Sequence, residues 1–224
     1  MDNEELTRLF SASGQRHGFT DVTAEYAPFR DFKIRWTRNY RWARFEVSDY
    51  MEDAPVNVMR PVADTVFKRI CGDKAPYPQT MRDWMMSREF LDSKRPLYIR
   101  RFDGFVQDLH GKVKDLSGSL DRLNDAGLVP KDGSVVVGWS DPNVSKCVGT
   151  ASIVMKTVSV STTLDRDYVD DDLLDYCLYS LLARVSMGMN PTGDSRGEEY
   201  EALLDRFPNR SRMESSLRML RLHV

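Results

Sequence analysis

The chain has 224 residues, of which 41% are hydrophobic and 29% charged, and this length and composition suit a folded protein with a sizeable core. The net charge of -2 at pH 7 excludes a global field that would draw the chain onto nucleic acid or a membrane surface, so binding of either kind requires a local patch. No apolar run reaches the length of about 18 residues that a membrane-spanning helix needs, and the first ten residues are acidic where a signal peptide is basic. Cys71, Cys147 and Cys177 lie far apart without CxxC spacing, which indicates reduced thiols. We therefore expect a cytoplasmic protein with no membrane partner.

The N-terminal half predicts helices on either side of a strand pair. Apolar residues at helical spacing predict a helix over residues 3–16. Aromatic and β-branched residues alternate on both sides of Asn39, which predicts either a strand pair or one long bent strand within residues 32–51. Asp53 and Pro55 predict the start of a helix that continues to Gly72. Residues 78–96 predict another helix, and residues 97–102 a short strand.

The C-terminal half predicts strands followed by helices. Residues 104–128 carry leucines at helical intervals that Gly111 and Gly118 weaken. We expect a strand over residues 134–141, a turn over 141–143 and a hairpin over 148–165. Three aspartates at 170–172 suit the start of a helix that runs from Leu173 to Met189, and two more helices follow at 197–206 and 210–222. The expected fold class is α+β, with a small, mainly antiparallel sheet covered by helices.

Most of the chain resembles a known family, and the segments that show it best lie in the C-terminal half. The stretch "VVVGWSDPNVSKCVGTASIVMKTVSVSTTLD", an acidic helix start, "LDYCLYSLLARV" and "GEEYEALLDRFPN" together are similar to the SprT-like, zincin-type metallopeptidase domain, especially its small archaeal members. The similarity covers residues 30–220 and is strongest from Ser134 to Asn209. It implies a zincin-like architecture, with an N-terminal helix and linker at residues 1–28 and a single SprT-like domain with C-terminal helices at 29–224.

The residues that carry the chemistry of that family are absent from this chain. In the family, a His-Glu-x-x-His helix supplies two zinc ligands and a general base, and a third His precedes a Phe-Pro pair. The resemblance places Ser180, Leu181, Arg184 and Arg196 at the first His, the Glu, the second His and the third His. A hydroxyl is a weak zinc ligand, leucine carries no proton to transfer and arginine offers no lone pair. We therefore expect no catalytic residue, no metal and no cofactor.

Two interpretations of these four positions stay open. In the first, the substitutions fill the former pocket, since Leu181 packs in the core and the arginines pair with acids such as Glu198, Glu199 or Asp205. In the second, Arg184, Arg196 and the Ser180 hydroxyl form a cationic pocket for a carboxylate or phosphate group, to which guanidinium geometry is suited.

A second candidate site is the segment from residue 30 to residue 45, where arginines alternate with aromatic residues. Its candidate residues, which we call the basic-aromatic patch, are Arg35, Trp36, Arg38, Tyr40, Arg41, Trp42 and Arg44. Such a pattern suits nucleic acid, because bases stack on rings and phosphates meet guanidinium groups. It is also typical of a sheet with one buried aromatic face and one solvated basic face, the interpretation that we favour.

The sequence thus predicts a pseudoenzyme, that is, a catalytically inactive homologue of a SprT-like peptidase that acts as a protein- or peptide-binding or scaffolding module. A peptide that adds to a strand edge requires backbone hydrogen bonds and no metal. The first alternative is a nucleic-acid-associated protein that uses the basic-aromatic patch. The second is an active metal-dependent hydrolase, which requires a metal site or nucleophile that the sequence does not offer.

Overall fold

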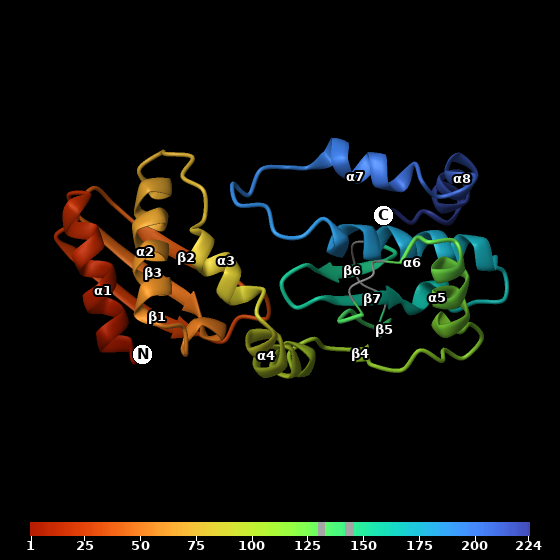
Figure 1. Cartoon of the computed structure of the whole chain (residues 1–224), viewed down its shortest axis with the longest axis horizontal. Coiled ribbons are helices and arrows are strands. Elements are labelled where there is room, and N and C mark those ends of the chain that lie inside the picture. Colours follow the sequence, from red (N-terminus) through yellow and green to blue (C-terminus); the bar gives the residue numbers. More distant parts are fainter. Residues whose placement is uncertain (130–132, 142–145) are drawn as a thin grey trace. The chain divides into compact units, whose positions relative to one another are not determined.

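Figure 1 shows the computed structural model of the chain, which describes residues 1–129, 133–141 and 146–224. The fold class is α+β, as expected, but the described strands form two small mixed sheets in place of one mainly antiparallel sheet. The chain divides into two compact units. The first comprises Met1–Arg101 and Met189–Asp194, and the second comprises Phe102–Gly188 and Ser195–Val224. The first boundary between the units therefore lies between residues 101 and 102. The resemblance implied a different division, with a domain that begins at residue 29.

The first unit is built from a three-stranded sheet and four α-helices. Its elements are α1 (Asn3–Arg16), β1 (Asp21–Ala27), β2 (Ile34–Arg38), β3 (Trp42–Ser48), a 3-10 turn (Asp49–Met51), α2 (Val56–Ile70), α3 (Gln79–Met85) and α4 (Arg88–Arg100). The strand order is β1-β3-β2, in which β1 is parallel and β2 antiparallel to β3. The expected strand pair on either side of Asn39 is confirmed as β2 and β3.

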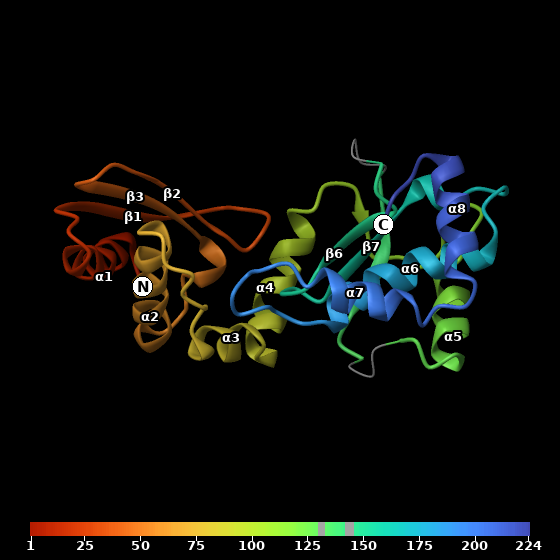
Figure 2. The same ribbon diagram turned by 90° about the horizontal axis from the view of Figure 1, so that it is seen from above.

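Helices α1 and α2 cover one face of this sheet (Figure 2). The buried ring of Phe45 on β3 lies 4.9 Å from the ring of Phe10 on α1 and 5.1 Å from that of Phe67 on α2. Gly14 allows α1 to approach closely, because a Cβ there would lie 2.7 Å from Val22 and 2.9 Å from Phe67. Aromatic packing of this kind fixes which face of β3 is buried.

Two sequence predictions in this unit are wrong. Residues 21–27, assigned to the linker, form β1, whose alternating Val22 and Ala24 are buried against the helices. The strand predicted over residues 97–102 is instead the end of α4, which continues through Pro96. Burial of Tyr98 and a hydrogen bond of 2.9 Å from Arg101 to the carbonyl of Phe29 hold this end in place, so the proline does not stop the helix.

The described residues of the second unit form a four-stranded sheet and four α-helices. Its elements are β4 (Phe105–Val106), α5 (Leu116–Asp125), β5 (Val136–Ser140), β6 (Gly149–Ser152), β7 (Thr157–Ser161), a 3-10 turn (Thr162–Leu164), α6 (Asp171–Ser186), α7 (Gly197–Leu204) and α8 (Arg210–Leu220). The strand order is β4-β5-β7-β6, in which β5 and β7 are parallel and the outer pairs antiparallel. The predicted hairpin is confirmed as β6 and β7.

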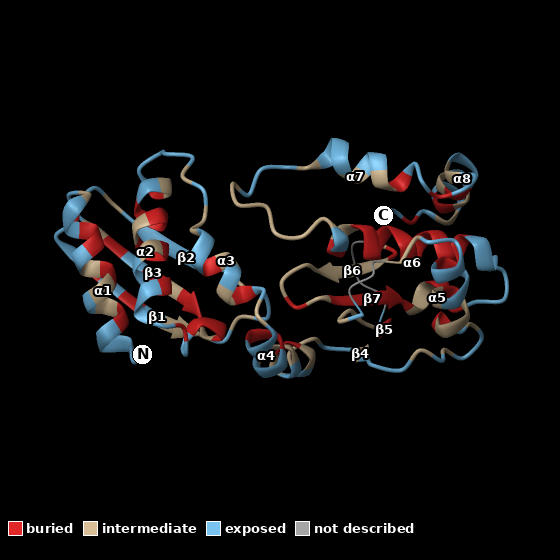
Figure 3. Cartoon of the chain, in the orientation of Figure 1, coloured by how far each residue is buried: buried red, intermediate tan, exposed pale blue. Residues whose placement is uncertain are grey.

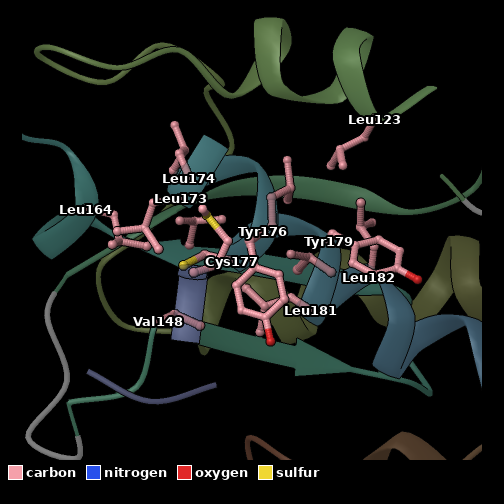
Figure 4. Close-up of a cluster of buried hydrophobic side chains, with 14 of the residues drawn as sticks. Leu123, Val148, Leu164, Leu173, Leu174, Tyr176, Cys177, Tyr179, Leu181 and Leu182 are labelled. Carbon is pink, nitrogen blue, oxygen red and sulfur yellow. The ribbon is translucent and has the colours of Figure 1, made fainter. Parts of the chain in front are cut away.

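Helix α6 is the centre of this unit and is buried along most of its length (Figure 3). Figure 4 shows its apolar side chains among those of the sheet and of α5. A helix that is apolar on all sides belongs inside a core, whereas the surface helices carry one apolar stripe. Within residues 104–128, where leucines recur at helical intervals, the structure has one helix, α5. Residues 142–143 of the predicted turn lie outside the described residues.

Candidate functional site

Ser180 and Leu181, the first two positions that the resemblance singles out, are buried side chains of α6. Ser180 has no exposed surface, and its hydroxyl donates a hydrogen bond of 2.6 Å to the carbonyl of Cys177 one turn earlier in the helix. Leu181 is 3% exposed and packs against β6, where a Cβ added to Gly149 would lie 2.7 Å from its Cδ1. Neither side chain is therefore placed to meet a ligand.

Tyr200 of α7 covers the same stretch of α6. Its hydroxyl donates to the carbonyl oxygen of Ser180 at 3.1 Å, and the guanidinium of Arg184 lies 4.7 Å from the centre of its ring. The Nε of Arg184 is buried without a hydrogen-bond partner among the described residues. Arg184 thus holds its charge against an aromatic face, whose negative π surface attracts a cation. Sequence reasoning missed Tyr200, although it follows Arg196 by one helical turn.

Arg196 lies where α6 ends and α7 begins. Its guanidinium donates to the carbonyl of Met187, the C-cap residue of α6, at 2.5 Å and forms an ion pair with Glu199. A cation is favourable at this place because helix dipoles leave the C-terminal carbonyls partly negative. Arg196 therefore joins two helices and is already paired with an acid.

The structure brings the four predicted residues to one region and gives them different tasks. Leu181 and Arg196 follow the first interpretation, in which one side chain packs and the other pairs with Glu199. The hydroxyl of Ser180 is directed at its own helix and away from a shared pocket. Arg184 forms no ion pair with any residue that the structure describes, so a cationic pocket built on both arginines stays a prediction.

The residues at these positions do not fit zinc. A buried hydroxyl, an aliphatic side chain and two arginines offer no set of neutral nitrogen or anionic ligands. In residues 1–129, 133–141 and 146–224, no three His, Cys, Asp or Glu side chains are grouped so as to hold a metal ion. Burial raises the pKa of the Cys177 thiol, which disfavours the thiolate that a nucleophile requires.

Asp165 is a buried carboxylate that sequence reasoning did not single out. It accepts hydrogen bonds from the backbone N–H groups of Lys112, Val113 and Lys114 at 2.7, 2.9 and 2.8 Å. Burial by itself raises the pKa of this carboxyl, but the three backbone donors outweigh burial and lower it below its ordinary value. The sequence feature that could have pointed to this carboxylate is the Leu-Asp pair at the end of the predicted hairpin. Asp165 anchors the loop that leads into α5.

The basic-aromatic patch lies in the first unit, on β2, β3 and the turn between them. Trp36 is 44% exposed and Tyr40 79% exposed, whereas Phe45 is buried, so only β3 shows the buried aromatic face that we expected. The exposed arginines without an ion pair inside the described chain are Arg38, Arg41 and Arg44. Two of them lie over neighbouring rings of the patch, at 5.5 Å for Arg41 on Tyr40 and 5.6 Å for Arg44 on Trp42.

A groove of about 980 Å³ runs over the face of this sheet that α2 does not cover, beside the first turns of α1. Its charged lining residues are Glu4, Arg8, Glu25, Arg35, Arg44 and Glu46. Acids and bases are therefore equal in number along the groove, and Arg35 and Glu46 form an ion pair at 3.1 Å. Such a surface gives little attraction to a polyanion, and the excess of positive charge lies outside it, along β2 and the turn.

Comparisons with protein families, with curated proteins and with solved structures find no match for this chain. None of the helices described here is both long and apolar enough to cross a bilayer.

Proposed function

We propose that the chain is a non-catalytic module that binds proteins or peptides and has the frame of a SprT-like, zincin-type peptidase. The observation that carries the proposal is the packing of α6 at the positions of the family's ligands and base. Ser180 and Leu181 are buried there, and Tyr200 lies over the helix. Without a general base or a metal ligand, binding is the activity that such a frame retains.

The edge strand β6 is our choice for peptide binding within this frame. It lies at one end of the sheet order and packs beside α6, and its four residues are all partly exposed. An extended peptide adds to such an edge through backbone hydrogen bonds, and pockets for alternate side chains give the selectivity. Neither requirement involves the lost metal centre.

The test is a selection of peptides from a random display library, followed by calorimetry with the enriched peptides. Each bound peptide is then incubated with the protein, with and without added zinc, and its mass is followed. We expect saturable binding and an intact peptide. Cleavage that a chelator prevents would overturn the proposal in favour of an active hydrolase, and the failure of every selected peptide to bind would overturn the binding module.

The cationic pocket is tested separately on the arginines of the second unit. If Arg184 and Arg196 hold a carboxylate or phosphate of the ligand, alanine at either position should weaken the binding of a selected acidic or phosphorylated peptide. We expect a loss of about tenfold for Arg184→Ala and for Arg196→Ala, which is the effect of one charge-assisted hydrogen bond. Arg212→Ala is the matched control, since Arg212 is an exposed arginine of α8. Unchanged affinity in both pocket variants would remove the pocket and leave the binding module.

A second candidate function is nucleic-acid binding through the basic-aromatic patch. The observation that favours it is the pair of exposed arginines, Arg41 and Arg44, over the rings of Tyr40 and Trp42, with no ion pair to the described residues. It predicts binding of a single-stranded oligonucleotide that weakens steeply with salt and falls when Arg38 and Arg41 are both changed to Gln. Binding that does not respond to salt would argue against it.

A further inference from the structure

The outer edge of β2 carries unused backbone hydrogen-bonding groups. In the β2–β3 pair, Ser48 donates to the carbonyl of Lys33 and Asn39 donates to that of Trp42, both at 3.0 Å. Since hydrogen-bonded pairs alternate along an antiparallel ladder, the backbone groups of Arg35 and Thr37 also face β3. Those of the residues between them therefore face away from the sheet.

The outward-facing residues are Ile34, Trp36 and Arg38. No hydrogen bond reaches their backbone groups from any residue that the structure describes. Most of β2 is exposed on both faces, which Figure 3 shows by its pale blue colour. An edge strand of this kind is a ready template for another strand.

The opposite edge of the same sheet is closed by α1. The Thr7 hydroxyl donates to the carbonyl of Ala24 at 2.8 Å and accepts from its N–H at 3.0 Å, and Ser11 donates to the carbonyl of Val22 at 3.1 Å. The side chains of a helix thus satisfy the backbone of β1. The sheet has one protected edge and one open edge, and the open edge is β2.

The charge around the open edge selects the chemistry of the occupant. Four of the five cationic side chains from Lys33 to Arg44 lack an ion pair with the rest of the described chain, and Arg35 is balanced by Glu46. A second copy of the chain would bring two arginine-rich edges together, which like charges disfavour. An acidic strand gains from the same charges, and alternate apolar residues would lie over the exposed ring of Trp36.

We propose that β2 pairs with an extended acidic segment of a partner protein, which adds as a fourth strand to the sheet of the first unit. This inference rests on the proposed function as a protein-binding module and assigns it a second surface, distinct from β6. Backbone hydrogen bonds to the outward-facing groups give the affinity, and the unpaired arginines select acidic partners.

The experiment uses the full chain and a fluorescent decapeptide of alternating Glu and Val, whose anisotropy reports binding. A decapeptide of alternating Lys and Val tests the sign of the charge, and a single-stranded oligonucleotide tests whether any polyanion suffices. We expect the acidic peptide to bind at least tenfold more tightly than the basic one. In the complex, hydrogen exchange of the amides of Ile34, Trp36 and Arg38 is slowed, while that of Gly149 and Ala151 on β6 is unchanged.

Trp36→Pro and Trp36→Val form a matched pair of variants. Proline is tolerated on an edge strand where the N–H faces solvent, so the sheet stays folded while one outward donor is lost. We expect Trp36→Pro to weaken the acidic peptide about tenfold relative to Trp36→Val, which corresponds to one hydrogen bond of about 1.4 kcal/mol. Arg38→Gln weakens the peptide several-fold and reduces the salt dependence of binding.

Equal affinity of the Pro and Val variants, or an absence of binding by the unmodified chain, would overturn the β2 assignment. An oligonucleotide that binds with equal strength and is indifferent to Trp36→Pro would assign the patch to nucleic acid. If peptides selected from the library bind the Trp36→Pro variant as tightly as the unmodified chain, the proposed function stands and the assignment of binding to β2 is wrong. Cleavage of a selected peptide would refute the proposed function by a route that does not involve β2.

Discussion

At the residue scale, Leu181 shows how this chain uses the position that the resemblance assigns to the general base. The helical pattern predicts that it faces the core with Leu174, Leu178 and Val185, and all four are buried. A leucine at this position fills space that a carboxylate could occupy only with water or a metal beside it. A leucine in place of a carboxylate therefore adds apolar packing against β6.

Truncation of this side chain gives the first prediction. We expect Leu181→Ala to lower the free energy of unfolding by about 2–4 kcal/mol. The truncation removes buried apolar atoms and leaves a cavity that the surrounding side chains fill only in part. Urea unfolding followed by circular dichroism measures it. Met219→Ala is the control, since Met219 is 78% exposed and its loss should have little effect. A cost for Leu181→Ala below about 1 kcal/mol would show that the position is loosely packed.

At the element scale, a single carboxylate connects the end of the β7 hairpin to the loop before α5. Asp165 is ionised in the folded chain and its pKa is lowered, because three backbone donors favour the charged form against the cost of burial. A group with a lowered pKa stabilises the fold fully above its unfolded pKa of about 3.9 and loses that contribution as the pH falls through its folded pKa.

The second prediction follows from this direction. We expect Asp165→Asn to cost about 2 kcal/mol of unfolding free energy near pH 7, since the amide loses the charge and turns one donor toward backbone N–H groups. The difference from the unmodified chain should shrink as the pH falls below about 4, and a series of urea unfolding curves across that range measures it. Asp167→Asn, an exposed neighbour, controls for the net charge. A difference that is constant with pH would contradict the role of the carboxylate.

The elements also show which patterns a single sequence reveals. Alternation around Asn39 and the apolar stripe of α2 were sufficient to predict β2, β3 and α2, because each repeats over many residues. The strand β1 was missed because Thr, Ala and Glu dilute its alternation. The end of α4 was missed because tertiary contacts of Tyr98 and Arg101 hold a helix that Pro96 by itself would end.

At the scale of the whole molecule, the division into two compact units had no signal in composition. No Gly-rich, Pro-rich or low-complexity stretch marks residues 101 and 102, and the segment Met189–Asp194 belongs to the first unit although it follows α6. Contacts between residues far apart in the chain create such units. The hydrogen bond of 2.7 Å from the N–H of Tyr77 to the carbonyl of Pro191 is one example that no local pattern contains.

The candidate site could be predicted only in part, because some of its contacts also join residues that are far apart in the chain. Which residues stand at the four positions that the resemblance singles out is a property of the sequence, and their chemistry alone argued against zinc. What covers them is a property of the fold, since Tyr200 reaches Ser180 and Arg184 across 20 and 16 residues of chain.

The third prediction concerns metal content, which depends on every side chain that the chain can bring together. We expect the purified, untagged protein to contain far less than one equivalent of zinc by elemental mass spectrometry, and its thermal midpoint to be unchanged by zinc or a chelator. The reason is that an ion that binds only the folded state raises its stability by RT ln(1 + [ion]/Kd). The described residues of α6 and α7 offer no set of side chains that could hold such an ion. A known zinc protein carried through the same purification controls for metal loss. Zinc near one equivalent with a chelator-sensitive midpoint would mean that ligands outside the family positions build a real centre, and the binding-module proposal would then give way to a metal-dependent hydrolase.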